Sequence, residues 1–102
     1  MAEARATSEA VSQDLVARRW QGRGFSCGLW VDPPGRTWEG YVHPVDELVM
    51  VVEGEVEFEV EGLVRRPAHG EELLIPARAR HSVRNVGAHE SRWLYGYAGG
   101  EG

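Results

Sequence analysis

Three residues of this sequence carry side chains that bind transition metals, and they lie at suggestive positions. His43 and Glu47 are four residues apart across Pro44, and His81 follows later in the chain, after a loop that contains Pro76. Two imidazoles and one carboxylate form a ligand set used by non-haem Fe(II), Mn, Ni and catalytic Zn sites that keep open positions. The spacing alone does not separate such a site from ordinary histidines near strand ends.

Glu47 gives a stronger indication, because it opens the run ELVMVV over 47–52, which is apolar on both faces. A strand of that kind is buried, and a buried carboxylate must be paired or bound to a metal. Tyr41 lies two residues before His43, so on a strand both side chains point to the same face. Tyr41 is therefore a fourth candidate for the same site.

The elements that must position these residues are β-strands. The segment 55–62 alternates strictly, with Val56, Phe58 and Val60 on one face and glutamates on the other, which is typical of a half-buried strand. We interpret the glutamate face as solvated. Further strands are predicted over 25–31, 37–43, 47–55, 81–87 and 91–97, with one or two more within 63–76. Seven or eight short strands separated by turns predict an all-β sandwich or barrel.

Residues 11–20 are ambiguous, since their apolar positions suit a short helix or an edge strand. We divide the chain into an extension over 1–24, which would supply an edge or swapped strand, a barrel over 25–98, and a flexible tail over 99–102. Residues 1–10 are expected to form a loose terminus.

Composition narrows the function classes. The 102 residues carry a net charge of −5, which argues against a general binder of nucleic acid or anionic membranes. All 11 basic residues are arginine, so Schiff-base lysine chemistry is excluded. The single cysteine, Cys27, excludes an intramolecular disulfide and a CxxC zinc site. No apolar run is long enough for a membrane span and no signal peptide is evident, so we expect a soluble, cytoplasmic protein.

Two motifs in this order resemble those of the cupins, and specifically of small single-domain cupins of the RmlC-like superfamily. The first is EGYVHPVDELVMVVEGE over 39–55, in which His43, Glu47 and Gly54 match the second histidine, the glutamate and the glycine of the family pattern. The second is GEELLIPARARHSVRN over 70–85, in which the matching residues are Gly70, Pro76, His81 and Asn85. The resemblance covers about residues 25–98 and implies a jelly-roll barrel, also called a double-stranded β-helix.

The resemblance also implies a metal site, with two departures. The family commonly holds a divalent metal on three histidines and one glutamate, whereas this chain has Tyr41 at the first histidine. Tyr41 would ligate as phenolate, donate a hydrogen bond to a metal-bound water, or fill the space. The second departure is Arg78, where the family has glycine. The implied cofactor is one divalent transition metal, Fe, Mn, Ni or Zn, held by His43, Glu47 and His81, and an empty barrel is the alternative.

Four other residues are candidates for contact with a ligand: Cys27, Trp38, Arg78 and Tyr95. Cys27 is otherwise a small core residue, and Arg78 is either a solvent-facing loop residue or, alone or with Arg80, an anion contact at the barrel mouth. Trp93, Tyr95 and Tyr97 share one face of their strand, and the pattern does not say whether that face points inward. Asn85 is expected to fix a turn or a strand end.

The sequence supports two function classes. The first is a metal-binding cupin that acts on or binds a small oxygenated molecule inside the barrel, with dioxygenase, isomerase or lyase chemistry if it is an enzyme. The second is a non-catalytic module that binds or senses a small ligand, with or without metal. A structural barrel without metal is the weakest reading, because Glu47 would then need another partner. The expected partners are a small molecule and, as a homodimer, a second copy of the chain.

Overall fold

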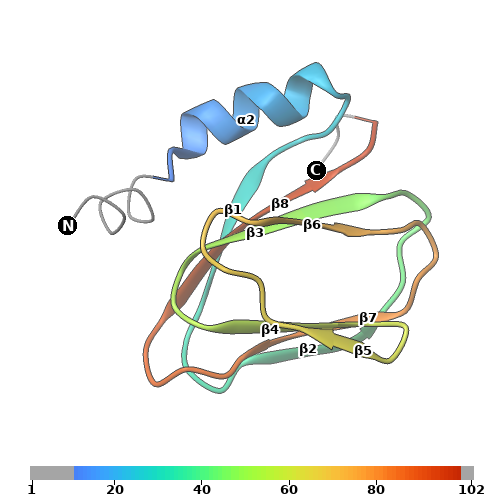
Figure 1. Ribbon diagram of the computed structural model, residues 1–102. Helices are drawn as coiled ribbons and strands as arrows, with labels where there is room; N and C mark the ends of the chain where they lie inside the picture. The colour runs from blue at the N-terminus through green and yellow to red at the C-terminus, as the bar shows by residue number, and fades with distance from the viewer. Residues whose placement is uncertain (1–10, 100–102) are drawn as a thin grey trace.

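Two facing β-sheets make up most of the molecule (Figure 1). The computed structural model describes residues 11–99, and within that range one helix and eight strands are formed. Their bounds are α2 (Gln13–Gly22), β1 (Gly28–Asp32), β2 (Thr37–Tyr41), β3 (Glu47–Glu53), β4 (Val56–Val60), β5 (Leu63–Arg65), β6 (Glu72–Ile75), β7 (His81–Asn85) and β8 (Ser91–Tyr97). The expectations for residues 1–10 and 100–102 lie outside the described residues.

The strand order is that of a jelly roll. One sheet has the order β1-β8-β3-β6 and the other the order β2-β7-β4-β5, with all pairs antiparallel. The chain therefore passes from one sheet to the other at β1–β2, β2–β3, β3–β4, β5–β6, β6–β7 and β7–β8. The predicted all-β jelly-roll barrel is confirmed, and the two connections that leave β2 and β6 lie at one end of it (Figure 1).

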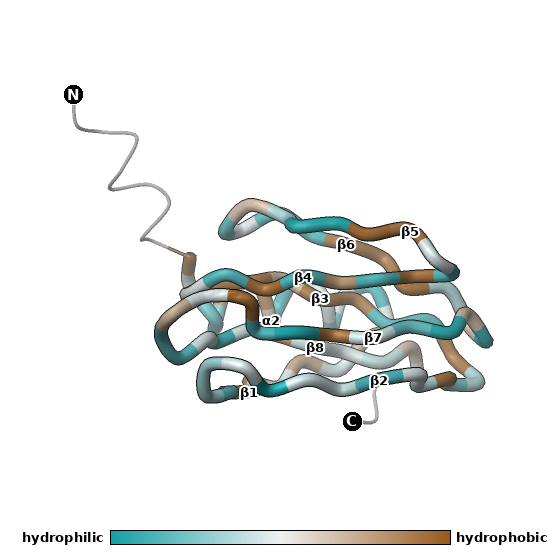
Figure 2. Tube along the Cα trace, turned by 90° about the horizontal axis from the view of Figure 1, so that it is seen from below, coloured by the Kyte–Doolittle hydropathy of each residue, from teal (hydrophilic) through white to brown (hydrophobic). Residues whose placement is uncertain are grey.

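The core between the sheets follows the alternation seen in the sequence. Val56 and Phe58 of β4 are buried inside, against residues of β3 and β7, and polar and apolar residues alternate along β4 in Figure 2. Glu57 and Glu59 lie on the outer face, as predicted, but they are not simply solvated. Arg84 of β7 donates to Glu57 at 2.8 Å and to Glu59 at 2.7 Å, so the outer face is tied together by ion pairs.

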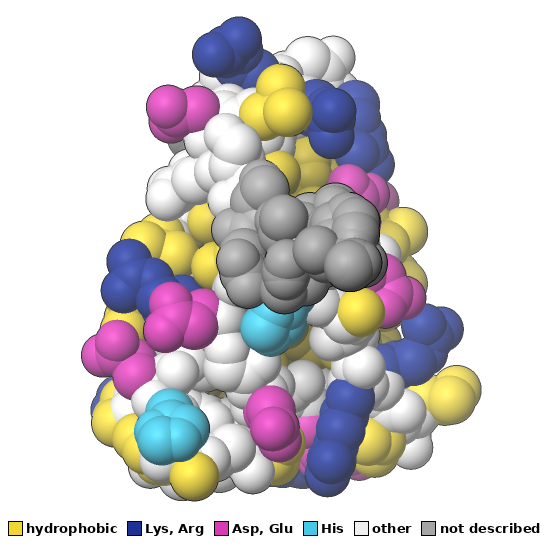
Figure 3. Space-filling model, turned by 60° about the vertical axis from the view of Figure 1, so that its left-hand side comes forward, with side chains coloured by type: hydrophobic (Ala, Val, Ile, Leu, Met, Phe, Trp, Pro, Cys, Tyr) yellow, Lys and Arg dark blue, Asp and Glu magenta, His cyan; other side chains and the backbone are white. Residues whose placement is uncertain are grey.

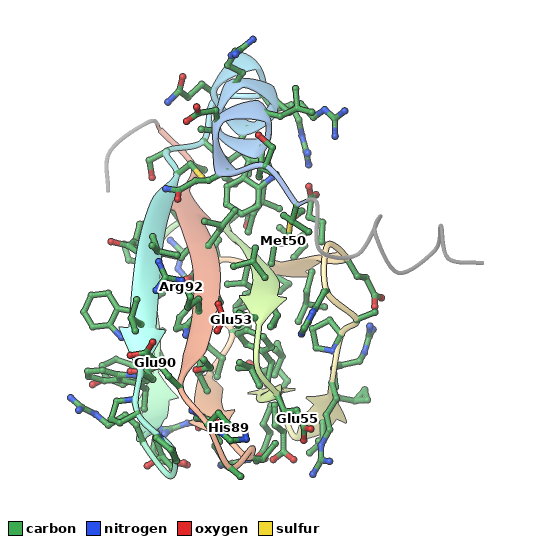
Figure 4. All side chains as sticks on the ribbon, turned by 90° about the vertical axis from the view of Figure 1, so that its left-hand side faces the viewer. Met50, Glu53, Glu55, His89, Glu90 and Arg92 are labelled. Atoms are coloured by element: carbon green, nitrogen blue, oxygen red, sulfur yellow. The ribbon has the colours of Figure 1, made fainter. Side chains whose placement is uncertain are left out.

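The helix α2 covers the outer face of the β1-β8-β3-β6 sheet (Figures 1 and 4). Ser12 caps it by accepting a hydrogen bond from the amide of Leu15, and Val16 and Trp20 are buried because they lie four residues apart on one helix face. Their partners include Met50, which Figure 4 shows beneath the helix. Of the two alternatives for this segment the structure has the helix, and residues 13–22 supply no edge strand within this chain.

The helix is held down at two further points. The indole of Trp20 donates to Glu72 at 3.1 Å, and Arg23 makes two hydrogen bonds to the same carboxylate. Gly96 lets the chain pass close by, since a Cβ atom there would overlap the carbonyl oxygen of Ser26. Both faces of this sheet are therefore covered, which explains why its central strand β3 is apolar over residues 48–52.

Arginine and acidic side chains are interspersed on the face shown in Figure 3. Among the described residues, no helix is long and apolar enough to cross a membrane.

Candidate metal centre

The three predicted ligands come together at one end of the barrel, although they belong to different elements. His43 lies in the connection from β2 to β3, Glu47 is the first residue of β3, and His81 is the first residue of β7. The site therefore joins the two sheets at the end where the β2–β3 and β6–β7 connections cross between them, on the right in Figure 1. Figure 4 looks at the opposite end, where Glu55 and His89 lie.

The ligand atoms of these residues point at one another. One nitrogen or oxygen atom from each of the three lies within 4.8 Å of the others. The Oε1 atom of Glu47 is 3.4 Å from Nε2 of His43 and 3.5 Å from Nε2 of His81. Glu47 is only 4% exposed, and within the described chain its Oε1 atom is buried with no hydrogen-bond partner. A buried carboxylate oxygen in that state requires a cation or a donor.

His81 is oriented for coordination by its other ring nitrogen. Nδ1 lies 3.0 Å from the carbonyl oxygen of Ala79, which can only accept, so Nδ1 carries a proton, and in the neutral ring the lone pair of Nε2 faces Glu47. Burial acts to lower the pKa of His81, but the Glu47 carboxylate and the Ala79 carbonyl outweigh it and the pKa lies above its ordinary value. Two imidazoles and a carboxylate in this arrangement fit a divalent transition metal.

Arg78 contacts the site through its backbone amide, not through its side chain. Its amide donates to the carbonyl oxygen of His43 at 2.7 Å, and the amide of Ala77 donates to the side chain of Asp46 at 2.7 Å. These two bonds join the β6–β7 turn to the β2–β3 connection. Arg78 has φ +68°, a left-handed conformation that favours glycine. This conformation explains why the motif that the sequence resembles has glycine at this position.

Two tyrosines approach the ligands. Tyr41 is the cross-strand partner of His81, lines the cavity and is 44% exposed. Tyr97, which the sequence did not single out as a site residue, has its hydroxyl 3.5 Å from Nε2 of His43 and is the cross-strand partner of Glu47. Burial, followed by the charge of Glu47 and by Tyr95, raises the pKa of Tyr97 to about 12, so this phenol is neutral at physiological pH.

A cavity of about 390 Å³ leads to the ligands, and most of its wall is aromatic. The predicted contacts Trp38 and Tyr95 both line it, and the undecided face of β8 points inward. The aromatic side chains that line it are Trp30, Trp38, Tyr41, Trp93, Tyr95 and Tyr97.

Asp32 supports this wall, although it is not among the site residues predicted from the sequence. Its carboxylate is 3% exposed and accepts hydrogen bonds from the indole nitrogens of Trp30 at 3.0 Å, Trp93 at 3.2 Å, and Trp38 at 3.2 Å to each oxygen. The sequence of β1 did not indicate a buried carboxylate here, because Asp32 also begins the DPPG sequence that typically marks a turn.

The other two predicted contacts, Cys27 and Arg78, are not among the residues that line the cavity. Cys27 packs beside Leu48 and Met50 in the cluster under the helix, on the other face of its sheet. Burial raises the pKa of its thiol, in keeping with a small core residue. The side chain of Arg78 is exposed, because the left-handed turn directs it outward.

The comparisons with known proteins agree with the fold. Residues 28–97 match the family described as Cupin domain, and the chain therefore belongs to the cupin family. A protein from Streptomyces cyaneus named "Polyketide synthase CurC" is 37% identical over 73 residues, which are 71% of this chain and 47% of that protein. The chain thus spans about half the length of this relative.

Two similar solved structures have names that state a ligand or a substrate. Salicylate 1,2-dioxygenase from Pseudaminobacter salicylatoxidans is 28% identical with a TM-score of 0.68, covering 74% of this chain and 22% of the enzyme. Oxalate oxidase in complex with glycolate is 27% identical with a TM-score of 0.67, covering 78% of this chain and 45% of the enzyme. The chain therefore spans less than half the length of either enzyme.

Proposed function

We propose that this cupin binds one divalent transition metal on His43, Glu47 and His81, and that a small oxygenated molecule binds against the metal inside the barrel. One observation carries the proposal. A buried carboxylate oxygen of Glu47 has no hydrogen-bond partner and faces a nitrogen atom of each histidine at 3.4 and 3.5 Å. A metal ion satisfies all three groups at once, whereas neutral imidazole lone pairs cannot.

The protein's own groups would serve that site in definite ways. Ala79 holds His81 in the tautomer that can ligate, and the Arg78 amide holds the backbone of His43. The neutral hydroxyl of Tyr97 would donate a hydrogen bond to an oxygen atom of the bound molecule. The aromatic wall limits the water that reaches the ligands. A bound Fe, Mn, Ni or Zn ion would supply Lewis-acid chemistry, and iron would add redox chemistry.

The proposed reaction class is dioxygenase with iron, and isomerase or lyase with the other metals. The names of the relatives support a small oxygenated substrate, since one is a salicylate dioxygenase and another an oxalate oxidase. Two finer expectations, a homodimer and a cytoplasmic location, stay predictions.

Titration of metal-free protein with each of the four ions, followed by thermal melting, tests the metal site. We expect a rise in melting temperature with at least one ion. His81→Ala should remove the response, whereas His89→Ala, an exposed histidine at the opposite end, should keep it. An equal response in both variants would overturn the assignment.

A non-catalytic binding module is the second candidate. This candidate is favoured by Tyr41, which occupies the position of the first histidine in the motif that the sequence resembles. The site therefore has three candidate ligands instead of four. A binder would melt at a higher temperature with its ligand but would leave the ligand unchanged after prolonged incubation with the metal-loaded protein.

A further inference from the structure

Within residues 11–99, the cavity wall has aromatic area that no other described residue covers. Trp30 is 39% exposed and Tyr41 is 44% exposed, although both line a concave surface. Large aromatic side chains that are exposed inside a cavity are typical of ligand sites, because the ligand supplies the missing contact.

The rings form a connected surface that reaches the proposed metal site. Trp30 packs edge-on against Trp38 at 5.5 Å between ring centroids and against Tyr95 at 6.1 Å. Tyr95 is 5.9 Å from Tyr97, whose ring is 4.9 Å from that of His43. The aromatic surface is therefore continuous from the exposed end of the cavity to one metal ligand.

Asp32 holds this surface in one arrangement. Both of its oxygen atoms are used, since Oδ1 accepts from Trp30 and Trp38 and Oδ2 accepts from Trp38 and Trp93. Three indoles tied to one carboxylate cannot rotate independently, so the wall is formed before a ligand binds. Asp32 is buried and fully occupied, and it offers no free charge to a ligand.

The charge of the lining limits the ligand further. The chain has no lysine, and no arginine is among the residues that line the described cavity. A ligand anion would be neutralised at the metal. A second anionic group would lie against aromatic rings, because the Arg36 guanidinium that stacks on Trp38 at 4.4 Å is not among the residues that line the cavity, and an unpaired anion there is costly. An organic cation, which aromatic rings also attract, would be repelled by a divalent ion at the inner end.

We infer that the cavity accepts a planar aromatic molecule that carries one oxygen donor, with the oxygen at the metal end and the ring system against the tryptophan wall. Asp32 acts as a positioning residue for this specificity, through the indoles of Trp30, Trp38 and Trp93. The inference rests on the proposed metal site for the oxygen end and on the wall alone for the ring end.

The test compares naphthol with decahydronaphthol, which has the same carbon skeleton and hydroxyl but is saturated and not flat. Calorimetric titration is carried out on zinc-loaded and metal-free wild-type protein. We expect naphthol to bind about tenfold more tightly in both forms, since aromatic pairing adds to area burial. On metal-free protein, oxalate and tetramethylammonium, as small dianion and cation, should not displace it; zinc-loaded protein is not used for this comparison, because oxalate chelates zinc itself. Equal affinity for the two alcohols, or tighter binding of either ion to metal-free protein, would overturn the inference.

Three substitutions test whether the preference for naphthol comes from the tryptophan wall. Trp38→Leu should weaken naphthol binding about tenfold and leave the zinc content unchanged. Asp32→Asn should also weaken it, through the indoles, with little change for decahydronaphthol. Trp20→Phe, under the helix and outside the cavity, is the matched control and should bind naphthol as wild type does. Unchanged binding in Trp38→Leu would contradict the inference even if Asp32→Asn does not fold.

The two proposals fail separately. Zinc uptake with no preference for naphthol would overturn the aromatic specificity and leave the metal site standing. Preference for naphthol with no metal uptake would support the wall and overturn the proposed function.

Discussion

The amide of Arg78 donates to the carbonyl oxygen of His43 at 2.7 Å, so a residue in a left-handed turn fixes the backbone of a proposed metal ligand. The contact uses no side-chain atom. Arg78→Gly should therefore preserve it and remove the strain of a left-handed non-glycine residue. Since part of the gain is offset by the added freedom of the unfolded chain, we expect stabilisation of about 0.5–1 kcal/mol.

Urea unfolding measures this change. Arg80→Gly is the control, because Arg80 is an exposed arginine of the same turn without the positive φ. It should not gain stability. If both variants lose stability equally, the left-handed residue is not a source of strain.

Asp32→Asn should destabilise the protein by about 1–3 kcal/mol, because an amide has one acceptor oxygen and its NH₂ group would face an indole donor. The free energy of unfolding in urea gives the magnitude, and near-ultraviolet circular dichroism should report altered tryptophan packing. Glu55→Gln, an exposed carboxylate at the same end of the barrel, should change the stability by less than about 0.5 kcal/mol. A neutral Asp32→Asn would mean that the indoles do not depend on this carboxylate.

Trp20→Ala should cost about 3–5 kcal/mol, since it opens a cavity under the helix and takes a donor from Glu72. Leu15→Ala, an exposed apolar residue of the same helix, should have little effect. Chemical unfolding of both variants makes the comparison. Similar losses for the two would show that the helix is not docked through Trp20.

Metal binding should depend on pH through His81. Its pKa in the folded, metal-free protein lies above the ordinary value of 6.5, so protonation stabilises that state below about pH 6.5, and this contribution is lost as the pH rises through the raised pKa. Metal needs the neutral ring, so the stabilisation by zinc should grow over the same rise. Melting temperatures with and without zinc across this range test it. A zinc effect that does not vary with pH would contradict the role of His81.

Much of the fold was predictable because a strand with one face toward the core between the sheets and one face toward solvent alternates apolar and polar residues. The alternation over 55–62 gave β4 correctly, with Val56 and Phe58 inside. The metal ligands were predictable for a different reason. The spacing of the two motifs identified His43, Glu47 and His81, and their ligand atoms lie within 4.8 Å of one another in the structure. Asn85 has the predicted structural role, because its side chain donates to the carbonyl groups of Asp32, Pro33 and His89.

The side-chain directions that could not be predicted depend on what covers each sheet. Because α2 packs on the outer face of β3 and β8, both faces of that sheet are apolar, and alternation could not tell inside from outside. This hid the inward direction of Tyr97 and the outward direction of Cys27. The convergence of three indoles on Asp32 joins β1, β2 and β8, and no local pattern reports such a contact.

Metal content tests the central claim most directly. Elemental analysis should be made on protein purified without a metal-affinity step, for wild type, Glu47→Gln and the exposed control Glu55→Gln. We expect about one equivalent of a transition metal in wild type and control, and loss of most of it in Glu47→Gln, which keeps the shape but removes the charge. Equal metal in all three, or none in wild type after reloading with each of the four ions, would contradict a metal centre on His43, Glu47 and His81.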